Sequence, residues 1–436
     1  MSLLFNMISE GCVTAPTGFR AGGVFCDIKR LGTGKGSDKG RKNDLAVLYS
    51  VSDAAVAGVF TTNQVSAAPV KVCLKRVPAG VARGIVANSG NANACTGDQG
   101  MQDALRMAEL TGQLLGTEPE KVLVCSTGRI GVKMPMENVE NGIREAVQIA
   151  DESPESAHKA AEAIMTSDTV RKEAAAELVL GGKKVKIGGM CKGAGMIQPG
   201  MSATGKRPAC APRQLHATML GFLTTDAAIE PEILQIALEE AVANSFNRIS
   251  VDGDMSTNDS VIALANGMAG NEKICSVESE DFKVFCKALS EVCLTLAKKM
   301  VRDGEGVSRF ITLKLEGAES FEDADAAVRA VANSALVKTS WCGGDPNWGR
   351  ILDALGYSSA KIDENKVDLA YSLPGDSRIL YVLKNGQPVD IPLSEVQQIT
   401  TQKEFDLHIF LHVGDVGTVF YTADLTEEYV DFNKGE

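Results

Sequence analysis

A stretch without hydrophobic periodicity divides this sequence into two halves that each have the pattern of folded protein. Residues 202–216, SATGKRPACAPRQLH, carry two prolines and three Lys or Arg side chains, which is typical of a loop or an extended connector. In both halves, short runs of β-branched and apolar residues alternate irregularly with segments of helical spacing. This irregular alternation favours an α/β (α+β) layered fold in which sheets are sandwiched with helices.

The apolar patterns place the individual elements. Strands are expected at 44–60, 81–88, 121–125, 174–180, 183–188 and 259–265. Helices are expected over 101–115, 135–149, 155–165, 231–244, 284–302 and 321–336, with strands from there to the C-terminus. The helix at 284–302 is the most strongly patterned, because four of its apolar residues share one face: Phe285, Leu289, Val292 and Leu296.

Two local signals mark the ends of elements. Ser126-Thr127-Gly128 follows the apolar run at 121–125 and is expected to close that strand with a turn. Gly304 stands where a helix over 284–302 would end, which places Glu305 on the turn just beyond it.

The charge and the apolar content exclude several classes of protein. The net charge is 44 − 56 = −12, which repels nucleic-acid phosphates and anionic membranes, so we expect neither as a partner. No apolar run reaches the ~18 residues of a membrane span. The eleven cysteines are an odd, scattered set without a CxxC pair, which indicates a reducing compartment, and we expect a cytoplasmic protein.

Several familiar motifs fail on inspection. The basic loop at 30–42 does not fit the phosphate-binding P-loop, and no GxSxG nucleophile elbow is present. The sequence from Asp252 resembles the start of a calcium loop, but its sixth and twelfth positions are Thr257 and Ala263 instead of Gly and Glu. His408 and His412 could share a strand face, yet an isolated histidine pair is a weak metal signal, so we predict no metal site and no cofactor.

Thr218 stands at the junction between the connector and a strand-like segment. If the bond before it were cut, its free α-amine would have a pKa of about 7.7–8.0. That amine could accept the proton of the same residue's hydroxyl, so one residue would supply both nucleophile and base. On composition alone, an ordinary β-branched strand residue is the simpler interpretation of Thr218.

The blocks along the chain resemble the ornithine acetyltransferases, also called glutamate N-acetyltransferases. The junction itself carries KGAGMI (192–197), ATML (217–220) and TDA (225–227). Further blocks match in the family's order and cover nearly the whole chain: FTTNQVSAAPV (60–70), NSGNANACTG (88–97), STGRIG (126–131), AIMTSDT (163–169), VDGDMSTNDS (251–260), VRDGEGVSRF (301–310) and GDPNWGRI (344–351).

The resemblance implies a self-cleaving enzyme that transfers an acetyl group from N-acetylornithine to glutamate. Cleavage between Ala217 and Thr218 would give fragments 1–217 and 218–436 and free Thr218 as the nucleophile. The resemblance also implies the remaining roles: Thr127 and Gly128 as the oxyanion hole, and Thr166, Lys192, Thr218, Glu305 and Asn433 as substrate-binding residues. It further implies a heterotetramer of two α and two β fragments, and it leaves acetyl-CoA open as a second acetyl donor.

The sequence departs from the family pattern at two places. The family usually has only a few residues between the GMI block and the Ala-Thr bond, so 202–216 is an insertion, which we expect to bulge outward and permit cleavage. The family also has Ser or Thr five residues after the position of Asn433, whereas this sequence stops at Glu436, so that contact is expected to be missing or supplied otherwise.

Two other functions remain open at this stage. An amidase or aminopeptidase on the same self-processed scaffold would pass the acyl group to water instead of glutamate. An unprocessed, non-catalytic binding protein would keep the chain whole.

Overall fold

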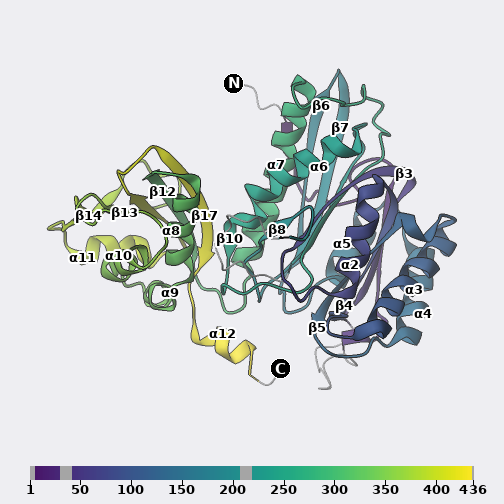
Figure 1. Ribbon diagram of the computed structural model, residues 1–436, viewed down its shortest axis with the longest axis horizontal. Helices are drawn as coiled ribbons and strands as arrows, with labels where there is room; N and C mark the ends of the chain where they lie inside the picture. The colour runs from purple at the N-terminus through teal and green to yellow at the C-terminus, as the bar shows by residue number, and fades with distance from the viewer. Residues whose placement is uncertain (1–4, 30–41, 207–218, 435–436) are drawn as a thin grey trace.

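The computed structural model describes residues 5–29, 42–206 and 219–434, and these residues form two lobes, each built on one sheet (Figure 1). The sheet of the first lobe has the strand order β1-β6-β7-β9-β11-β3-β4-β5, and two more strands, β2 and β8, pair with β3. Its strands are β1 (Phe5–Ile8), β2 (Phe19–Val24), β3 (Leu45–Thr61), β4 (Val81–Asn91), β5 (Val122–Arg129), β6 (Lys172–Leu180), β7 (Lys183–Lys192), β8 (Met201–Ser202), β9 (Leu220–Thr225) and β11 (Ser260–Ala265).

The strand β9 lies in the middle of this sheet, hydrogen-bonded to antiparallel β7 and to parallel β11. All six of its residues are buried. The first half of the sequence contributes β7 and the second half contributes β9 and β11, so the two halves share one sheet.

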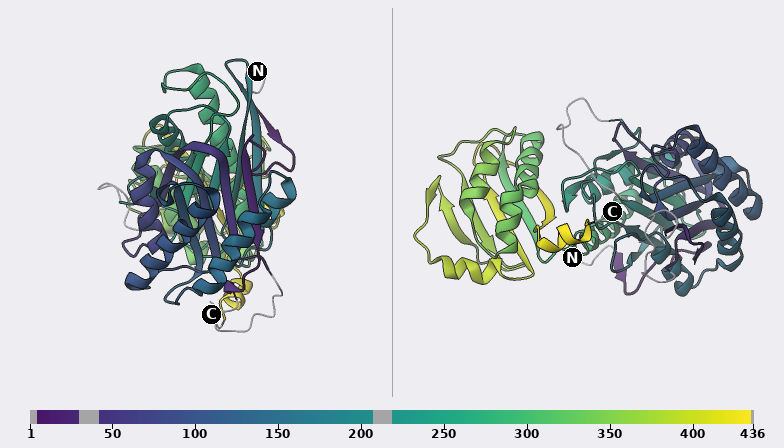
Figure 2. Two further views of the ribbon diagram at one scale, coloured as in Figure 1. Left: turned by 90° about the vertical axis from the view of Figure 1, so that its right-hand side faces the viewer. Right: turned by 90° about the horizontal axis from the view of Figure 1, so that it is seen from below.

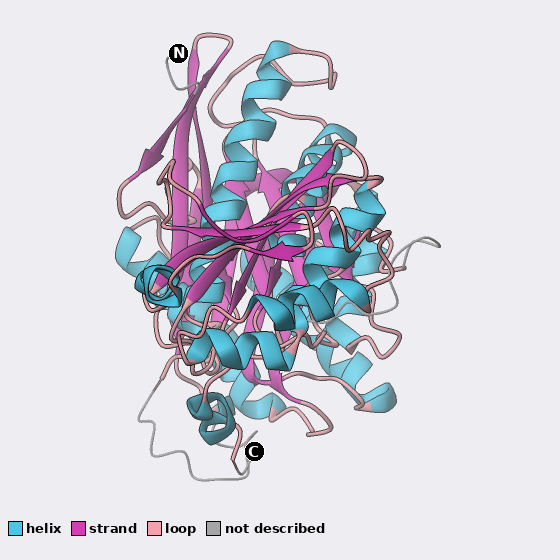
Figure 3. Ribbon diagram, turned by 90° about the vertical axis from the view of Figure 1, so that its left-hand side faces the viewer, coloured by secondary structure: helices cyan, strands magenta, loops and turns pink. Residues whose placement is uncertain are grey.

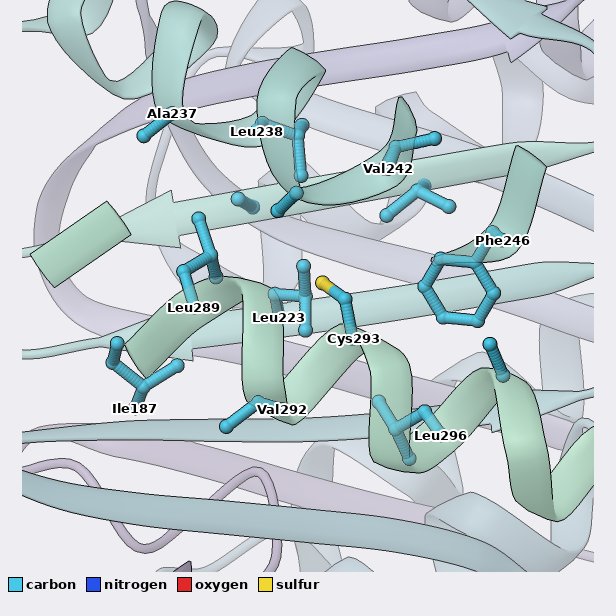
Figure 4. Close-up of a cluster of buried hydrophobic side chains, with 14 of the residues drawn as sticks. Ile187, Leu223, Ala237, Leu238, Val242, Phe246, Leu289, Val292, Cys293 and Leu296 are labelled. Atoms are coloured by element: carbon cyan, nitrogen blue, oxygen red, sulfur yellow. The ribbon is translucent and has the colours of Figure 1, made fainter. Parts of the chain in front are cut away.

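Helices cover the first lobe on both sides of its strands. They are α2 (Ala68–Arg76), α3 (Gly97–Leu115), α4 (Met136–Ile149), α5 (Pro154–Ala163), α6 (Pro231–Ala243) and α7 (Glu280–Arg302), with 3₁₀ turns at Val77–Ala79, Pro119–Lys121 and Phe246–Arg248. Apolar residues of α6 and α7 pack on those of β7 and β9, as Figure 4 shows for Leu238, Leu296, Ile187 and Leu223. Residues of α3 and α4 form a separate cluster with β3, β4 and β5.

The second lobe is a seven-stranded sheet with helices on one face. Its strands run in the order β10 (Ile249–Ser250), β17 (Val416–Ala423), β12 (Phe310–Ala318), β16 (Glu404–Phe410), β13 (Asp368–Ser372), β14 (Leu380–Lys384) and β15 (Gln387–Pro388). The helices α8 (Phe321–Asn333), α9 (Ala335–Cys342), α10 (Trp348–Gly356) and α11 (Leu393–Thr400) contribute to one buried apolar cluster with this sheet. Figure 3 looks onto this lobe, with its strands lying across the more upright strands of the first lobe.

The last helix returns from the second lobe to the first. After β17 the chain forms α12 (Glu427–Phe432), which lies between the two lobes when they are seen from below (Figure 2). The Thr426 hydroxyl donates to the carbonyl of Gly306 at 2.6 Å, and the Tyr429 hydroxyl lies 3.4 Å from a carboxylate oxygen of Asp252. The C-terminal residues are thereby held beside the turn that follows α7.

The layered α/β fold class is confirmed, and the buried face of α7 is the one predicted, since Phe285, Leu289, Val292 and Leu296 are each at most 2% exposed. The helix ends at Arg302, and Glu305 lies on the turn beyond it. The expected loop at 30–42 and the connector at 202–216 lie mostly outside the described residues.

Three local expectations were wrong. The segment expected as one helix at 321–336 forms two helices, α8 and α9, with Ser334 between them. The Ser334 hydroxyl accepts a hydrogen bond from Val337 N–H and thereby caps the start of α9. The region after it is not strands alone, since α9, α10, α11 and α12 alternate with them. Thr127 and Gly128 are not in a turn but in the last part of β5, where their pairing with β4 extends the strand.

Among the described residues, no helix combines the length and the apolar character that a membrane span needs. This agrees with the absence of a long apolar run in the sequence.

The packing of α7 on the central strands makes a testable prediction. Leu296→Ala removes a fully buried side chain from this interface and is expected to destabilise the protein by about 2–5 kcal/mol, through lost apolar burial and the cavity left behind. Leu105→Ala, at a position on α3 that is 45% exposed, is the control and should change stability by less than about 0.5 kcal/mol. The midpoints of urea unfolding measure both, and equal midpoints for the two variants would contradict the packing described.

Candidate active site

The site is built around the start of β9. Met219 is fully buried, and its backbone N–H donates to Oδ1 of Asp259 at 2.5 Å. Leu220 pairs with Lys192 on β7 and with Ser260 on β11. Ala217 and Thr218 lie outside the described residues, and Met219, the next residue in the chain, is the first described residue after them.

Asp259 is the most buried carboxyl group of this region. Its exposure is 0%, its Oδ1 accepts from Met219, and its Oδ2 has no hydrogen-bond partner among the described residues. Burial raises the pKa of Asp259 well above its usual range, although the Met219 N–H and the charge of Lys192 oppose the shift. Burying an acceptor without a hydrogen-bond partner costs free energy of folding. We therefore expect Oδ2 of Asp259 to have a function.

Thr127 and Gly128 lie in β5 against an unusually close backbone neighbour. Gly128 has φ of 128°, and a Cβ atom there would lie 2.4 Å from the carbonyl carbon of Gly90 on β4. Only glycine fits both the left-handed backbone and the space. Gly128 is exposed, whereas the Thr127 side chain is buried. The backbone at Gly128 is therefore accessible next to the buried Thr127 hydroxyl.

The Lys192 ammonium hydrogen-bonds two of the threonines that the sequence analysis assigned to the site. Its Nζ donates to Oγ1 of Thr166 at 2.8 Å and to Oγ1 of Thr127 at 3.3 Å, and its side chain is 2% exposed. Lys192 is the last residue of β7, and the backbone N–H of the next residue, Gly193, donates to Asp168 at 2.7 Å.

Lys172, Asp168 and Asp303 form a buried network of ion pairs next to Lys192. The Lys172 ammonium is 2.6 Å from Oδ1 of Asp168 and 2.5 Å from Oδ2 of Asp303, and all three side chains are at most 6% exposed. Asp168 also accepts from Thr166 N–H at 3.0 Å, and Asp303 accepts from the backbone N–H of Thr169. The network therefore ties the segment before β6 to the turn at the end of α7.

The two lysines of this network have opposite pKa shifts for a geometric reason. Burial lowers the pKa of both, but two carboxylates in direct contact outweigh it at Lys172 and raise the pKa there. The nearest carboxylate oxygen to Lys192 is 4.0 Å away, so burial prevails and lowers the pKa of Lys192. Burial alone would raise the pKa of Asp168, but Lys172 and Lys192 together hold it below its usual range.

Glu305 completes the charged side chains of the site. Its backbone N–H donates to the carbonyl of Ala194 at 2.9 Å, and its carboxylate lies so close to Gly195 that a Cβ atom there would approach the carboxyl carbon to 2.5 Å. Asn433 reaches the same carboxylate from beyond α12, with its Nδ2 3.1 Å from Oε2 of Glu305. The turn after β7 thus carries Lys192 at its start and holds Glu305 against its glycines.

The described residues of the expected site therefore come together from distant parts of the sequence. Thr127, Gly128, Thr166, Lys192, Glu305 and Asn433 lie on five separate segments around the turn after β7 and the start of β9. Sequence reasoning missed Asp168, Lys172, Asp259 and Asp303. Asp168, Asp259 and Asp303 lie inside blocks quoted for the family resemblance, and for Asp168 and Asp303 the available signal was a carboxylate two residues from an assigned residue.

His408 and His412, the pair that the sequence placed on one strand face, have structural partners. His408 shares a hydrogen bond with the Ser372 hydroxyl at 2.9 Å, and His412 lies 3.0 Å from a carboxylate oxygen of Asp368. Both rings stack on Phe410. The described residues contain no group of three or more His, Cys, Asp or Glu side chains placed to hold a metal ion.

Comparisons with known proteins identify the family of the chain. A family model described as the ArgJ family matches residues 21–435. The arginine biosynthesis bifunctional protein ArgJ of Symbiobacterium thermophilum is 47% identical over 97% of this chain and 98% of its own length. That of Clostridium acetobutylicum, ArgJ 1, is 44% identical over 93% of this chain and 95% of its own length.

Solved structures resemble the chain as well. The crystal structure of ornithine acetyltransferase complexed with ornithine, from Mycobacterium tuberculosis, matches with 37% identity over 45% of this chain and 100% of that chain, with a TM-score of 0.41. The crystal structure of the arginine biosynthesis bifunctional protein ArgJ from Bacillus halodurans matches with 36% identity over 45% of this chain and 98% of that chain, with a TM-score of 0.42.

The buried charge network predicts a pH-dependent stability loss. Asp168→Asn is expected to cost about 3–5 kcal/mol at pH 7, because it removes one partner of a buried ion pair. The folded pKa of Asp168 is depressed, so its contribution is complete above its unfolded pKa of about 3.9 and is lost as the pH falls through the folded value. Urea midpoints of the wild type and the variant should therefore differ most near neutral pH, begin to approach each other below about pH 4, and converge only as the pH falls through the folded pKa of Asp168.

Glu319→Gln is the matched control, because Glu319 pairs with Lys361 at 2.8 Å while both side chains are more than half exposed. It should cost no more than about 1 kcal/mol at any pH. A stability difference for Asp168→Asn that persisted unchanged in acid would mean that the ionised carboxylate is not the source of the effect.

Proposed function

Because this chain belongs to the ArgJ family, we propose that Thr218 carries an acetyl group from N-acetylornithine to glutamate after the chain is cut between Ala217 and Thr218. The chain is an acetyltransferase of arginine biosynthesis. The observation that supports the proposed route is the convergence of Thr127, Lys192 and Asp259 on Met219 and Leu220, the two residues that follow Thr218 in the chain.

The proposed reaction has two halves at one hydroxyl. The Thr218 hydroxyl attacks the acetyl carbonyl of N-acetylornithine, and its proton passes to the α-amine that cleavage has freed. Ornithine leaves, and the amine of glutamate then attacks the acetyl-Thr218 ester. Thr127 and Gly128 donate to the oxyanion of each tetrahedral intermediate, a contribution of about 3–4 kcal/mol in comparable sites.

The charged residues fit the ends of the two substrates. Both substrates carry an α-carboxylate, for which Lys192 is the buried cation of the site, beside the hydroxyl of Thr166. Only N-acetylornithine carries a side-chain ammonium, and Glu305 with Asn433 supplies a carboxylate for it. We assign to Asp259 the placing of Thr218, because it holds the backbone N–H of the residue bonded to it.

Further features of the proposal rest on the family alone. The curated relatives are named bifunctional, and we propose direct acetylation of glutamate from acetyl-CoA as the second activity of the same site. We also propose a cytoplasmic heterotetramer made of two fragments 1–217 and two fragments 218–436.

The intact mass of the denatured protein tests the cleavage. The wild type is expected to give two fragments of nearly equal length, the second beginning at Thr218. Thr218→Ala should stay whole and inactive because it lacks the hydroxyl, whereas Thr218→Ser keeps a hydroxyl and should still be cut. An unbroken wild-type chain after long incubation would remove the free α-amine and with it the proposed mechanism, and would favour a non-catalytic binding protein.

The fate of the acetyl group tests the reaction itself. With N-acetylornithine labelled in its acetyl group, the label is expected in N-acetylglutamate, and initial rates at several fixed glutamate concentrations should give parallel double-reciprocal lines, as in a ping-pong mechanism. Thr218→Ala provides the blank for spontaneous transfer. Label that accumulated as free acetate despite saturating glutamate would identify an amidase on the same nucleophile.

A further inference from the structure

The Lys192 ammonium lies against the side chain of Thr127, one of the two donors of the proposed oxyanion hole. Its Nζ lies 3.3 Å from Oγ1 of Thr127 and 2.8 Å from Oγ1 of Thr166. An ammonium group has donors only, so both hydroxyl oxygens accept from it. The Thr127 hydroxyl proton must therefore point away from Lys192.

Among the described residues, the Lys192 ammonium donates no hydrogen bond to a carboxylate. Asp168 is the nearest carboxylate, at 4.0 Å, and its two oxygens already accept from other groups. Oδ1 accepts from Lys172 and from Gly193 N–H, and Oδ2 accepts from Thr166 N–H. Asp168 thus stabilises the protonated lysine from a distance and leaves its donors to the two threonines.

We propose that Lys192 is a positioning residue of the oxyanion hole, which orients and polarises the Thr127 hydroxyl toward the oxyanion. This role is additional to any contact with a substrate carboxylate, and it rests on the proposed function of Thr218. A hydroxyl that accepts from a cation becomes a stronger donor, and a buried charge acts with little screening by water.

The step in which Lys192 acts is balanced without a proton from it. A bond forms between Thr218 Oγ and the acetyl carbon, and the carbonyl electron pair moves onto oxygen. The hydroxyl proton goes to the Thr218 α-amine, and the oxyanion accepts from the Thr127 O–H and the Gly128 N–H. When the intermediate collapses, the bond from carbon to the ornithine nitrogen breaks and the proton moves to that nitrogen. Lys192 keeps its three protons throughout.

An ester without a carboxylate separates this role from carboxylate binding. The probe p-nitrophenyl acetate can acetylate Thr218 but offers Lys192 no carboxylate, and the burst of p-nitrophenol reports the rate. Lys192→Gln is expected to slow this burst on the order of 100-fold, the usual cost of losing an oxyanion-hole donor. Lys192→Arg should restore most of the rate because it keeps the charge. Lys361→Gln, an exposed lysine in the second lobe, is the charge-matched control.

Rates are divided by the amount of cleaved chain, which mass spectrometry counts. A wild-type burst rate in Lys192→Gln, together with a raised KM for N-acetylornithine, would reduce Lys192 to a carboxylate-binding residue and overturn the proposal. Failure of the proposed function is a separate result, since then the wild type itself would form no acetyl-Thr218.

A measurement on the wild type covers the case in which Lys192→Gln stays uncut. The burst rate with the ester should rise as the α-amine loses its proton and fall again at higher pH as Lys192 loses its own. The charged groups around Lys192 are Asp168, Lys172, Glu305 and Asp259, with Lys29 farther away. A rate that rose to a plateau without an alkaline fall would contradict the proposal.

Lys29 needs its own control in that profile. Burial lowers the pKa of Lys29 to about 8, although Asp44 opposes the shift, so Lys29 also loses its proton in mildly alkaline solution. Its ammonium donates to the carbonyl of Asn43 at 2.7 Å. The profile is therefore repeated with Lys29→Met, and an alkaline fall that persists in this variant is the expected result. Its disappearance would assign the fall to Lys29 and count against Lys192.

Discussion

The contact between the Lys172 ammonium and two buried carboxylates fixes the rest of the site. Lys172 begins β6, Asp168 lies four residues before it, and Asp303 directly follows the last residue of α7. Leaving one of these charges unpaired and buried would cost several kcal/mol, so the ion pairs favour the packing of these three segments against one another. Thr166 lies just before Asp168 and Glu305 just after Asp303. One ion network therefore sets the distance between two parts of the site that are far apart in sequence.

Close backbone packing sets the other side of the site. Gly128 lies against Gly90, and the Glu305 carboxylate lies against Gly195, each at a distance that a Cβ atom would prevent. The Gly128 contact is made by backbone atoms alone and therefore leaves its peptide N–H little freedom, whereas the Glu305 carboxylate is placed by its contact with Gly195 and by the Asn433 amide. Preorganised donors of this kind stabilise developing charge without having to reorganise during the reaction.

The charged side chains that the structure describes in this site are lysines and carboxylates. Lys192 supplies a cation and Glu305 and Asp259 supply carboxyl groups, while in the proposed mechanism the α-amine of Thr218 is the base. The burial of Asp259 favours its neutral form, and Lys172 keeps Asp168 ionised, so two carboxyl groups of the same region are held in different states. Their different partners account for this, since Asp168 contacts an ammonium and Asp259 contacts only a backbone N–H among the described residues.

The sequence by itself determined the layered α/β class, the family and the buried face of α7, because periodicity is local and the family blocks are contiguous, and its assignment of site residues stays a prediction. It did not predict that β5 runs through Thr127 and Gly128, since the pairing with β4 that extends it joins residues about forty positions apart. It also missed Asp168, Lys172, Asp259 and Asp303. A buried carboxylate and a solvated one look alike in a sequence, and only the folded chain decides which lysine an aspartate meets and whether water is excluded from both.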